Sequence, residues 1–465
     1  MEKILNLIKK YIPRRLFKVL QPGYHFILSW LAVLVYRFPS ERLIVIGITG
    51  TTGKTTSAYL IAKMLEQAGY KVGFTTTALF NDGQKEWLND KKMTMVGRFF
   101  TQRILRRMLS NKCQYAIIET TSEGIGQFRH RFINYDILIF TGLYPEHIEA
   151  HGSFDKYKEV KGKLFAHLKR CRTKYANEKK YIHHLVTGMK KIELNRVKKI
   201  IIANLDDKEA NYFIDFWAEE KLGYKKGVEG VGEKKEKEIA VFYNKVEVSD
   251  TGTSFYIHRK KINLQLLGEF NTTNAMNAVC LGLSQNLTFE KIKEGLEKIS
   301  GVPGRFEIVK AGQNFTVIVD YAFEPGAVKK LYETVDLIPH NKIIHVLGSA
   351  GGGRDKARRP LLGKIAGQKA NYVIITNEDP YDEDPQVIID EVAGGAIKAG
   401  KKINENLFKI LDRRKAIKKA LSLAEEKDIL IITGKGSEQA ICIANGEKVP
   451  WDDRVVVKEE LSHNM

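Results

Sequence analysis

Short apolar runs alternate with longer segments of helical periodicity along most of this chain. Runs rich in branched apolar residues occur at 43–48, 116–119, 137–140, 199–202, 317–319, 343–347, 372–376 and 429–433. Such runs are typical of strands buried on both faces of a parallel sheet. Strands that alternate with helices predict an α/β fold, in which a parallel sheet is wrapped by helices and ligands bind at the carboxyl ends of the strands.

The first 36 residues have a different pattern. Residues 1–20 carry six basic residues and one acidic residue, with apolar positions at helical spacing, which predicts a basic amphipathic helix. Pro22 and Gly23 separate it from an apolar stretch at 26–36, which is shorter than the ~20 residues of a membrane-spanning helix. Two interpretations stay open: two helices packed on the body of the protein, or a segment that lies on a membrane surface.

Composition narrows the class of protein without choosing the function. At ~150 residues per domain, 465 residues allow about three domains, and 43% hydrophobic with 28% charged residues excludes collagen, a coiled coil and wholesale disorder. The net charge of +20 would suit nucleic acid, anionic lipid or phosphorylated substrates. Four widely spaced cysteines form no Cys-x-x-Cys pair, so we expect neither a zinc ribbon nor a disulfide framework, and a cytoplasmic location.

The segment after the first apolar run has the residues of a phosphate-binding loop. A glycine-rich turn lies between the strand at 43–48 and a predicted helix, and it consists of Gly50, Thr51, Thr52, Gly53, Lys54, Thr55 and Thr56. Backbone amides in such a turn surround phosphate oxygens, and the helix N-terminus adds positive potential. Lys54 supplies a point charge and the Thr55 hydroxyl can ligate Mg²⁺. The sequence therefore predicts ATP binding.

This loop, together with further blocks in the same order over residues 41–454, resembles the Mur ligase family of ATP-dependent amide-forming ligases. Within that family the chain is most similar to the branch that adds the third amino acid of the peptidoglycan stem peptide. The resemblance implies a helical segment at 1–40, a central ATP-binding domain at 41–300 and a Rossmann-like C-terminal domain at 301–465. The implied substrates are ATP, a muramyl-peptide and a free amino acid, and no nucleic acid is expected.

The resemblance also implies two Mg²⁺ ions. Thr55 would hold the first, and Glu119 and His147, at or just after strand ends, would hold the second. Lys161 matches a family lysine that is carbamylated by CO₂ and then ligates or orients the second ion. Three neighbouring lysines at 156, 158 and 163 would instead suit a solvated basic face.

Four further positions match family residues that meet ATP. Asn271 and Asn274 lie in the block beside the adenine, although an Asn just before a helix also serves as an N-cap. Arg305 and Asp320 are expected to reach the nucleotide across a closed interdomain cleft, where the fixed fork of an arginine suits phosphate oxygens. The usual family histidine is Phe323 here, so we expect one nucleotide contact either to be lost or to be replaced by stacking.

The peptide and the amino acid are the least determined partners. Thr121 and Arg129 match positions that touch the muramyl-peptide, while the expected substrate loop is changed to Thr-Met-Val-Gly at 94–97, and the usual domain that grips the uridine diphosphate end is missing. Asp379, Tyr381, Gly434 and Glu438 are the candidates for the amino acid site. Tyr381 stands where enzymes that add diaminopimelate have an arginine, so lysine or another basic amino acid is favoured.

Three alternatives were weighed. Folylpolyglutamate synthesis shares the scaffold, but the Lys-Thr-Thr of the loop and an Arg-Asp-Lys block at 354–356 favour the Mur branch. The branch that acts on lipid-linked precursor with an amidotransferase partner has a four-cysteine ribbon, which this sequence lacks. A nucleotide-dependent scaffold would need the loop, but not Glu119, His147 and Lys161 together.

Overall fold

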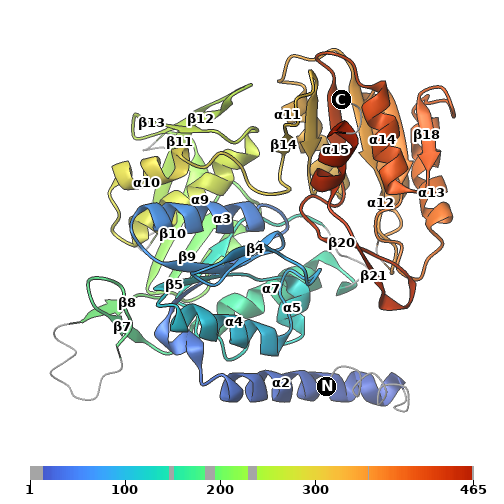
Figure 1. Cartoon of the computed structure of the whole chain (residues 1–465). Coiled ribbons are helices and arrows are strands. Elements are labelled where there is room, and N and C mark those ends of the chain that lie inside the picture. The colour runs from blue at the N-terminus through green and yellow to red at the C-terminus, as the bar shows by residue number, and fades with distance from the viewer. Residues whose placement is uncertain (1–13, 146–150, 184–193, 229–237, 354, 463–465) are drawn as a thin grey trace.

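The structure is a computed structural model that describes residues 14–145, 151–183, 194–228, 238–353 and 355–462. In this part of the chain two large sheets, each with helices on both faces, lie side by side (Figure 1). One sheet is built from residues 44–264 and the other from residues 307–432. The α/β class that the strand pattern predicts is confirmed. The change of sheet between Leu264 and Glu307 supports our proposal of a domain boundary near residue 300.

Eleven of the described strands form the larger sheet, in the order β13-β12-β11-β10-β9-β6-β1-β5-β2-β3-β4. They are β1 (Ile44–Thr49), β2 (Val72–Thr75), β3 (Leu79–Asn81), β4 (Glu86–Leu88), β5 (Tyr115–Glu119), β6 (Ile137–Phe140), β9 (Ile200–Asn204), β10 (Glu220–Lys226), β11 (Glu238–Ser249), β12 (Gly252–Ile257) and β13 (Lys260–Leu264). Strand β1 lies between parallel neighbours β5 and β6, so the loops after all three strands meet at one edge. That edge carries the glycine loop and Glu119.

Helices cover both faces of this sheet, which is why its central strands β1, β5 and β6 are buried along their whole length. Helices α3 (Lys54–Gln67), α9 (Phe270–Ser284) and α10 (Phe289–Glu297) pack on one face. Helices α4 (Arg98–Ser110), α5 (Ser122–Gly126), α7 (Phe154–Leu168) and α8 (Ala210–Ile214) lie on the other. Ile46 of β1 belongs to the first core and its neighbour Val45 to the second. A small hairpin, β7 (Lys174–Ala176) with β8 (Asn195–Val197), extends from the sheet.

The second sheet has six described strands in the order β14-β15-β19-β16-β17-β18. They are β14 (Glu307–Val309), β15 (Thr316–Val319), β16 (Ile343–Leu347), β17 (Tyr372–Thr376), β18 (Leu407–Ile410) and β19 (Ile429–Ile432). All pairs except β14 with β15 are parallel. Helices α11 (Pro325–Val335), α12 (Arg358–Lys369) and α13 (Pro385–Lys398) cover one face, and α14 (Arg413–Leu423) with α15 (Asp453–Ser462) the other. A hairpin of β20 (Ala440–Cys442) and β21 (Lys448–Pro450) follows β19, with the short helix η3 (Ala444–Gly446) at its turn.

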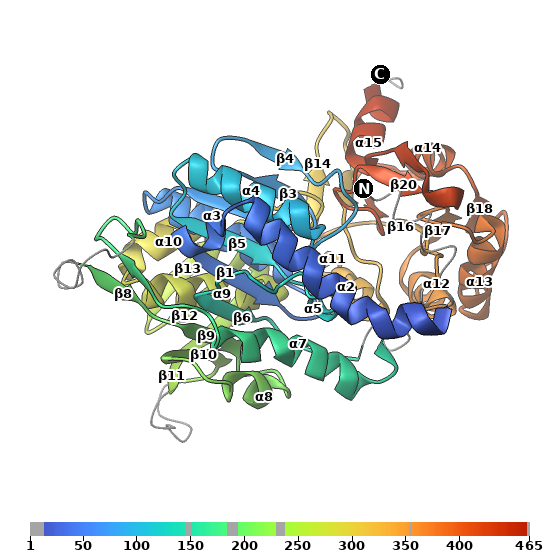
Figure 2. The same cartoon turned by 90° about the horizontal axis from the view of Figure 1, so that it is seen from below.

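Residues 14–35 form one long helix, α2 (Arg14–Val35), followed by the short helix η1 (Pro39–Arg42). Helix α2 lies at the bottom of the molecule in Figure 1 and crosses in front of it in Figure 2, which is seen from below. The expectation of two helices separated at Pro22 is therefore wrong, because α2 passes through Pro22. A proline inside a helix removes one backbone hydrogen bond, and a helix that lies on the surface leaves the freed carbonyl open to water. Among the described residues, we find no helix with the length and apolar character needed to cross a membrane.

Candidate functional site

The glycine loop between β1 and α3 has the backbone of an anion-binding turn. Gly50 and Gly53 have φ angles of 154° and 78°, and a Cβ on Gly50 would lie 2.1 Å from Thr141 Oγ1, so a side chain is excluded there. Lys54 Nζ folds over the loop and donates to the carbonyl oxygens of Gly50 at 3.1 Å and Thr51 at 2.6 Å. The loop, its lysine and the start of α3 thus form a cradle that fits a polyphosphate.

Glu119 connects the end of β5 to this cradle. Its side chain is buried, with the residue 1% exposed, and Oε2 accepts from Thr55 Oγ1 at 2.9 Å and from the Thr77 backbone N–H at 2.8 Å. Oε1 accepts from Thr77 Oγ1 at 3.0 Å. These donors are neutral, so the contacts leave the carboxylate charge uncompensated. Two hard oxygen ligands side by side, Thr55 Oγ1 and Glu119 Oε2, suit Mg²⁺.

Lys161 lies on the opposite side of the loop. It is 1% exposed on α7, and its Nζ is 2.9 Å from the Gly50 carbonyl oxygen and 3.4 Å from Thr49 Oγ1. The alternative of a solvated basic face is wrong for this lysine, because α7 turns Lys161 inward while Lys163 is exposed. Lys161 therefore places a buried amine directly at the glycine loop.

His147 lies outside the described residues. His151, which was given no role from the sequence, has its Nε2 3.1 Å from Ser122 Oγ, and its ring centroid lies 5.3 Å from that of Tyr157. Burial and the nearby Lys161 charge lower the pKa of His151, so the ring is neutral at neutral pH and able to accept a proton or bind a metal. Its spacing after His147 was the signal that could have marked it.

Asn271 and Asn274 lie beside the glycine loop on the first turns of α9. Asn274 Nδ2 donates to Asn271 Oδ1 at 3.0 Å, and a Cβ on Gly53 would lie 2.4 Å from Asn274 Oδ1. The N-cap interpretation of Asn271 is wrong: α9 begins at Phe270, its N-cap is Glu269, and Asn271 Nδ2 donates back to the Leu267 carbonyl at 2.8 Å. Two buried amides therefore border the loop on the side of α9.

Arg305 reaches the site from the other domain. Its Nη2 donates to Thr55 Oγ1 at 3.3 Å, and its guanidinium carbon lies 4.3 Å from the centre of the Tyr321 ring. Asp320 accepts the backbone N–H groups of Phe306 and Ala322, each at 2.6 Å, and burial raises the pKa of its carboxyl although Arg305 opposes this. Asp320 thus holds the segment that carries Arg305. Phe323 is in the place of the family histidine, and the guanidinium carbon of Arg358 lies 5.2 Å from the centre of its ring.

Thr121 and Arg129 line the opposite side of β5. Thr121 caps α5, its Oγ1 accepting from the Gly124 N–H at 3.2 Å. Arg129 donates to the carbonyl of Met95 and to Gln127 Oε1 at 2.6 Å, so it touches the loop at 94–97 where the sequence places a substrate loop. Burial lowers the pKa of Arg129.

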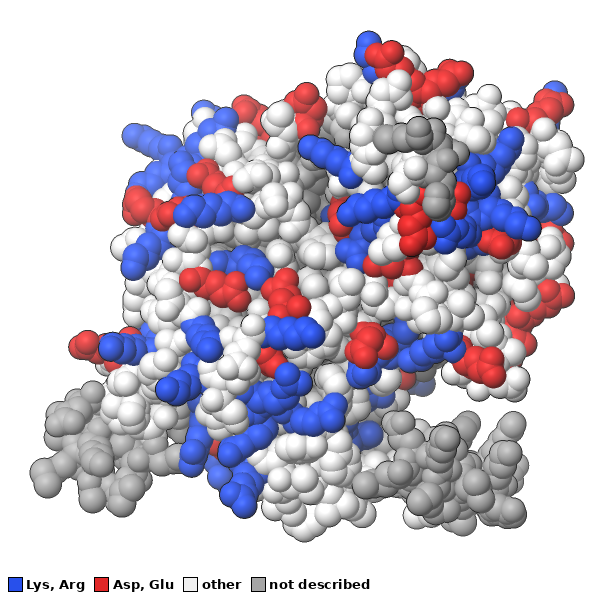
Figure 3. Space-filling model, viewed as in Figure 1, with Lys and Arg blue, Asp and Glu red and all other residues white. Residues whose placement is uncertain are grey.

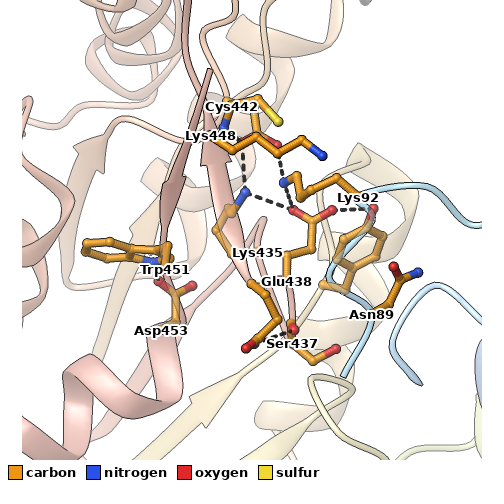
Figure 4. Close-up of polar contacts among 12 residues, drawn as sticks. Asn89, Lys92, Lys435, Ser437, Glu438, Cys442, Lys448, Trp451 and Asp453 are labelled. Carbon is orange, nitrogen blue, oxygen red and sulfur yellow. Dashed lines mark hydrogen bonds and ion pairs between the residues drawn. The ribbon is translucent and has the colours of Figure 1, made fainter. Parts of the chain in front are cut away.

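Asp379 follows the end of β17 and Glu438 follows the end of β19, and Lys435 contacts both carboxylates. Figure 4 shows Glu438 with Lys435 and Lys92. Lys435, which is 0% exposed, lies 2.8 Å from Asp379 Oδ1 and 2.8 Å from Glu438 Oε2. A second ammonium, that of Lys92, contacts both carboxylates from the central domain. Gly434, at φ 99°, leaves room for Glu378, since a Cβ there would lie 2.4 Å from Glu378 Oε2. Tyr381, at φ 52°, lies two residues after Asp379.

Lys92, Lys435 and Thr77 escaped the sequence analysis. Lys435 lies between the candidate residues Gly434 and Glu438, and nothing in the local sequence marks Thr77 or Lys92 as functional. The contacts of these residues with Glu119, Asp379 and Glu438 mostly join segments that are distant in the sequence. The sequence therefore predicts the strand ends, whereas the partners of those strand ends come from the fold.

The comparisons with known proteins agree with this geometry. The chain matches the Mur ligase middle domain over residues 48–198 and the Mur ligase, glutamate ligase domain over residues 304–436. It is similar to the UDP-N-acetylmuramyl-tripeptide synthetase of Roseiflexus sp. (strain RS-1), with 34% identity over 449 residues that cover 95% of this chain and 83% of the relative.

The chain is also similar to solved structures. One of a UDP-N-acetylmuramoyl-L-alanyl-D-glutamate–2,6-diaminopimelate ligase has 25% identity and a TM-score of 0.56, over 91% of this chain and 79% of that one. The Mycobacterium tuberculosis folylpolyglutamate synthase shares the fold at 14% identity, with a TM-score of 0.62 over 88% of this chain and 92% of the other. The likeness to the synthase concerns the fold alone.

Proposed function

Because this chain belongs to the Mur ligase family, we propose that it is an ATP-dependent ligase that joins an amino acid to a muramyl-peptide precursor of peptidoglycan. The peptide carboxylate takes the γ-phosphoryl group of ATP, and the amine of the amino acid then displaces phosphate from the acyl phosphate. The products are an amide, ADP and phosphate. The observation that carries the proposal is the Thr55–Glu119 pair at the glycine loop, contacted across the domains by Arg305.

The roles of the site residues are part of this proposal. Lys54 and the loop amides of residues 50–56 hold the phosphates, Asn271 and Asn274 border the adenine, and Arg305, positioned by Asp320, meets the phosphates from the second domain. Thr55 would hold one Mg²⁺, and Glu119, His147 and carbamylated Lys161 a second. A bound Mg²⁺ supplies positive charge to the transferring phosphoryl group. Thr121 and Arg129 would hold the muramyl-peptide.

For the amino acid we propose lysine or another basic amino acid rather than diaminopimelate. Asp379 and Glu438 are carboxylates that already hold primary ammonium groups, and Tyr381 cannot provide a bidentate partner to a second substrate carboxylate. Purified protein with ATP, muramyl-peptides and single amino acids, followed by product mass, tests both proposals. Ligation of diaminopimelate with lysine inert would overturn the choice of amino acid, and absence of any amino-acid-dependent phosphate release would overturn the ligase itself.

Folylpolyglutamate synthesis is distinguished in the same assay. Replacing the muramyl-peptide by a folate, with glutamate as the amino acid, gives a product of different mass. The chain's identity to a tripeptide synthetase, 34%, against 14% to the folylpolyglutamate synthase, favours the muramyl-peptide.

We further propose a cytoplasmic enzyme that associates peripherally with an anionic membrane through α2. One face of α2 packs on the body through Ser29, Ala32 and Val33. The other face exposes large apolar side chains, including a Trp30 that is 46% exposed, so Trp30 is not a core residue. The exposed set is Leu20, Phe26, Ile27, Trp30, Leu31, Leu34, Val35 and Phe38. In Figure 3 the described residues at the middle of the lower edge are uncharged, and Lys and Arg lie above them.

An exposed apolar face next to basic residues suits a lipid surface, where each basic residue contributes about 1 kcal/mol. Co-sedimentation with anionic and with neutral vesicles, for the full chain and for a chain that begins at Ser40, tests this. Salt-sensitive binding of the full chain to anionic vesicles alone is expected. Equal partitioning of both chains would exclude the membrane role.

A further inference from the structure

Lys92 places a lysine ammonium of the central domain inside the acidic pair of the C-terminal domain. Its side chain is 4% exposed, and Nζ lies 2.7 Å from Asp379 Oδ2 and also contacts Glu438 Oε2 (Figure 4). A four-carbon stem that ends in a primary ammonium is also the distal part of free lysine. The contact therefore shows that the space between these two carboxylates accepts an alkylammonium group.

The charges of the pocket leave room for one such cation. Lys435 belongs to the same domain as Asp379 and Glu438, is fully buried and bonds to both, so it stays with them. Asp379, Glu438 and Lys435 together carry a net charge of −1, and Lys92 brings the sum for these four groups to zero. The buried Glu378 and Arg413 beside them have opposite charges. The ammonium group of a substrate cannot enter while Lys92 remains, since it would be a third cation beside two anions.

The loop that carries Lys92 is held at its base and strained at its tip. We call residues 89–94 the Lys92 loop. Asn89 Nδ2 donates to the carbonyls of Thr76 at 2.9 Å and Met93 at 3.0 Å, which closes the base. Lys92 itself has a φ of 55°, a left-handed conformation that costs a non-glycine residue free energy and that its buried contacts offset. Loss of those contacts favours release of the tip.

The same loop touches the phosphate side of the site. Thr94 Oγ1 lies 2.8 Å from Thr77 Oγ1, and Thr77 donates to both oxygens of Glu119. Lys92 and Thr94 are two residues apart, so a displacement of Lys92 acts next to a partner of Glu119. The pocket and the candidate metal carboxylate are thus connected through one short segment.

We propose that the Lys92 loop is an intramolecular competitor at the amino acid site, which an incoming amino acid with a primary ammonium on its side chain displaces. This inference rests on the proposed ligase function and deepens it. A tethered group acts at an effective concentration in the millimolar range, so only a ligand that makes better use of both carboxylates replaces it. Amino acids without a side-chain cation leave the loop in place and the pocket closed.

Lys92→Met, which keeps the length and removes the charge, tests the competition. The fraction of protein with an open pocket rises, so the Kd of L-lysine, measured by calorimetry with a non-hydrolysable ATP analogue, falls by about 3- to 30-fold, and the KM for lysine falls with it. Lys91→Met is the matched control, because Lys91 pairs with Asp90 at the surface. Lys91→Met should leave the Kd and the KM of lysine unchanged. L-norleucine, which has no side-chain ammonium, should show no difference between either variant and the wild type.

Binding of n-butylammonium, followed by the shift in melting temperature, separates this inference from the proposed function, since it needs no ligation. A larger shift for Lys92→Met than for the wild type supports the competition even if no amino acid is ligated. An equal or smaller shift, or a raised KM for lysine, overturns it and makes Lys92 a structural or substrate-binding residue. Lys92→Gln provides the same comparison if the methionine variant does not fold.

Discussion

Arg305 and Thr55, which are 250 residues apart in the chain, form a hydrogen bond of 3.3 Å between the two domains. Thr55 Oγ1 also donates to Glu119, so the hydroxyl stands between a guanidinium and a carboxylate. The contact between the two domains thus brings the Arg305 guanidinium to the point where the proposed phosphoryl transfer takes place.

Replacement of the Arg305 guanidinium should reduce turnover rather than stability. Arg305→Lys keeps the charge but loses the planar donor pair, and we expect kcat/KM for ATP to fall by about 10- to 100-fold. The free energy of unfolding should change by less than about 1 kcal/mol, since Arg305 is partly exposed. Steady-state kinetics and urea unfolding measure the two effects. Wild-type kinetics would remove Arg305 from the site.

Lys54 should be indispensable for the chemical step. Lys54→Ala removes the ammonium that lies over the glycine loop, and we expect a loss of at least about 100-fold in kcat at saturating ATP. Lys63→Ala, on the same helix but paired with Glu66 and Glu86 at the surface, is the control and should retain activity. A kcat of Lys54→Ala close to that of the wild type would refute the phosphate-binding assignment.

Lys161 provides a test of the carbamate. Lys161→Ala should be inactive and regain part of its activity with added formate or acetate, because a small anion can enter the vacated position. Lys163→Ala, two residues along α7 and exposed, should behave like the wild type with and without additives. Full activity of Lys161→Ala without an anion would show that no carbamate is needed.

A buried ion cluster at the start of β6 should dominate stability. Asp136 Oδ2 accepts from Lys174 at 2.5 Å and Oδ1 from Lys199 at 2.7 Å, and all three side chains are at most 3% exposed. Asp136→Asn leaves two buried ammonium groups without their anion and should cost about 3–5 kcal/mol in urea unfolding. Asp155→Asn, at an exposed carboxylate, should cost less than about 0.5 kcal/mol. A cost below about 1 kcal/mol for Asp136→Asn would contradict this account.

His345 should make stability depend on pH. Burial lowers its pKa to about 3, and its ring bonds to Tyr332 Oη at 2.8 Å and Thr433 Oγ1 at 3.0 Å. The unfolded chain takes up this proton near pH 6.5, so the free energy of unfolding falls by up to about 1.4 kcal/mol per pH unit as pH drops from 6.5 towards 3. His345→Gln should lower that slope between pH 6 and 5 relative to the wild type, in which other buried histidines such as His130 also contribute. An unchanged slope would show that His345 does not contribute.

Local chemistry made much of this fold and site predictable. The apolar run at 43–48 is buried on both faces, and the glycine turn after it adopts positive φ at Gly50 and Gly53, because both features depend on residues next to one another. Glu119 was marked by its position at the end of a strand, since parallel strands bring their carboxyl ends to one edge.

Other features depend on which segments pack together, and only the tertiary structure decided them. Lys161 and Lys163 have similar sequence surroundings, yet α7 buries one and exposes the other. Pro22 predicted a break that the surface position of α2 tolerates. Lys92 lies among charged residues in the sequence, and its contacts with Asp379 and Glu438 exist only because the second domain packs against its loop. Periodicity and turn chemistry act over a few residues, whereas these contacts join parts of the chain that only the folded domains bring together.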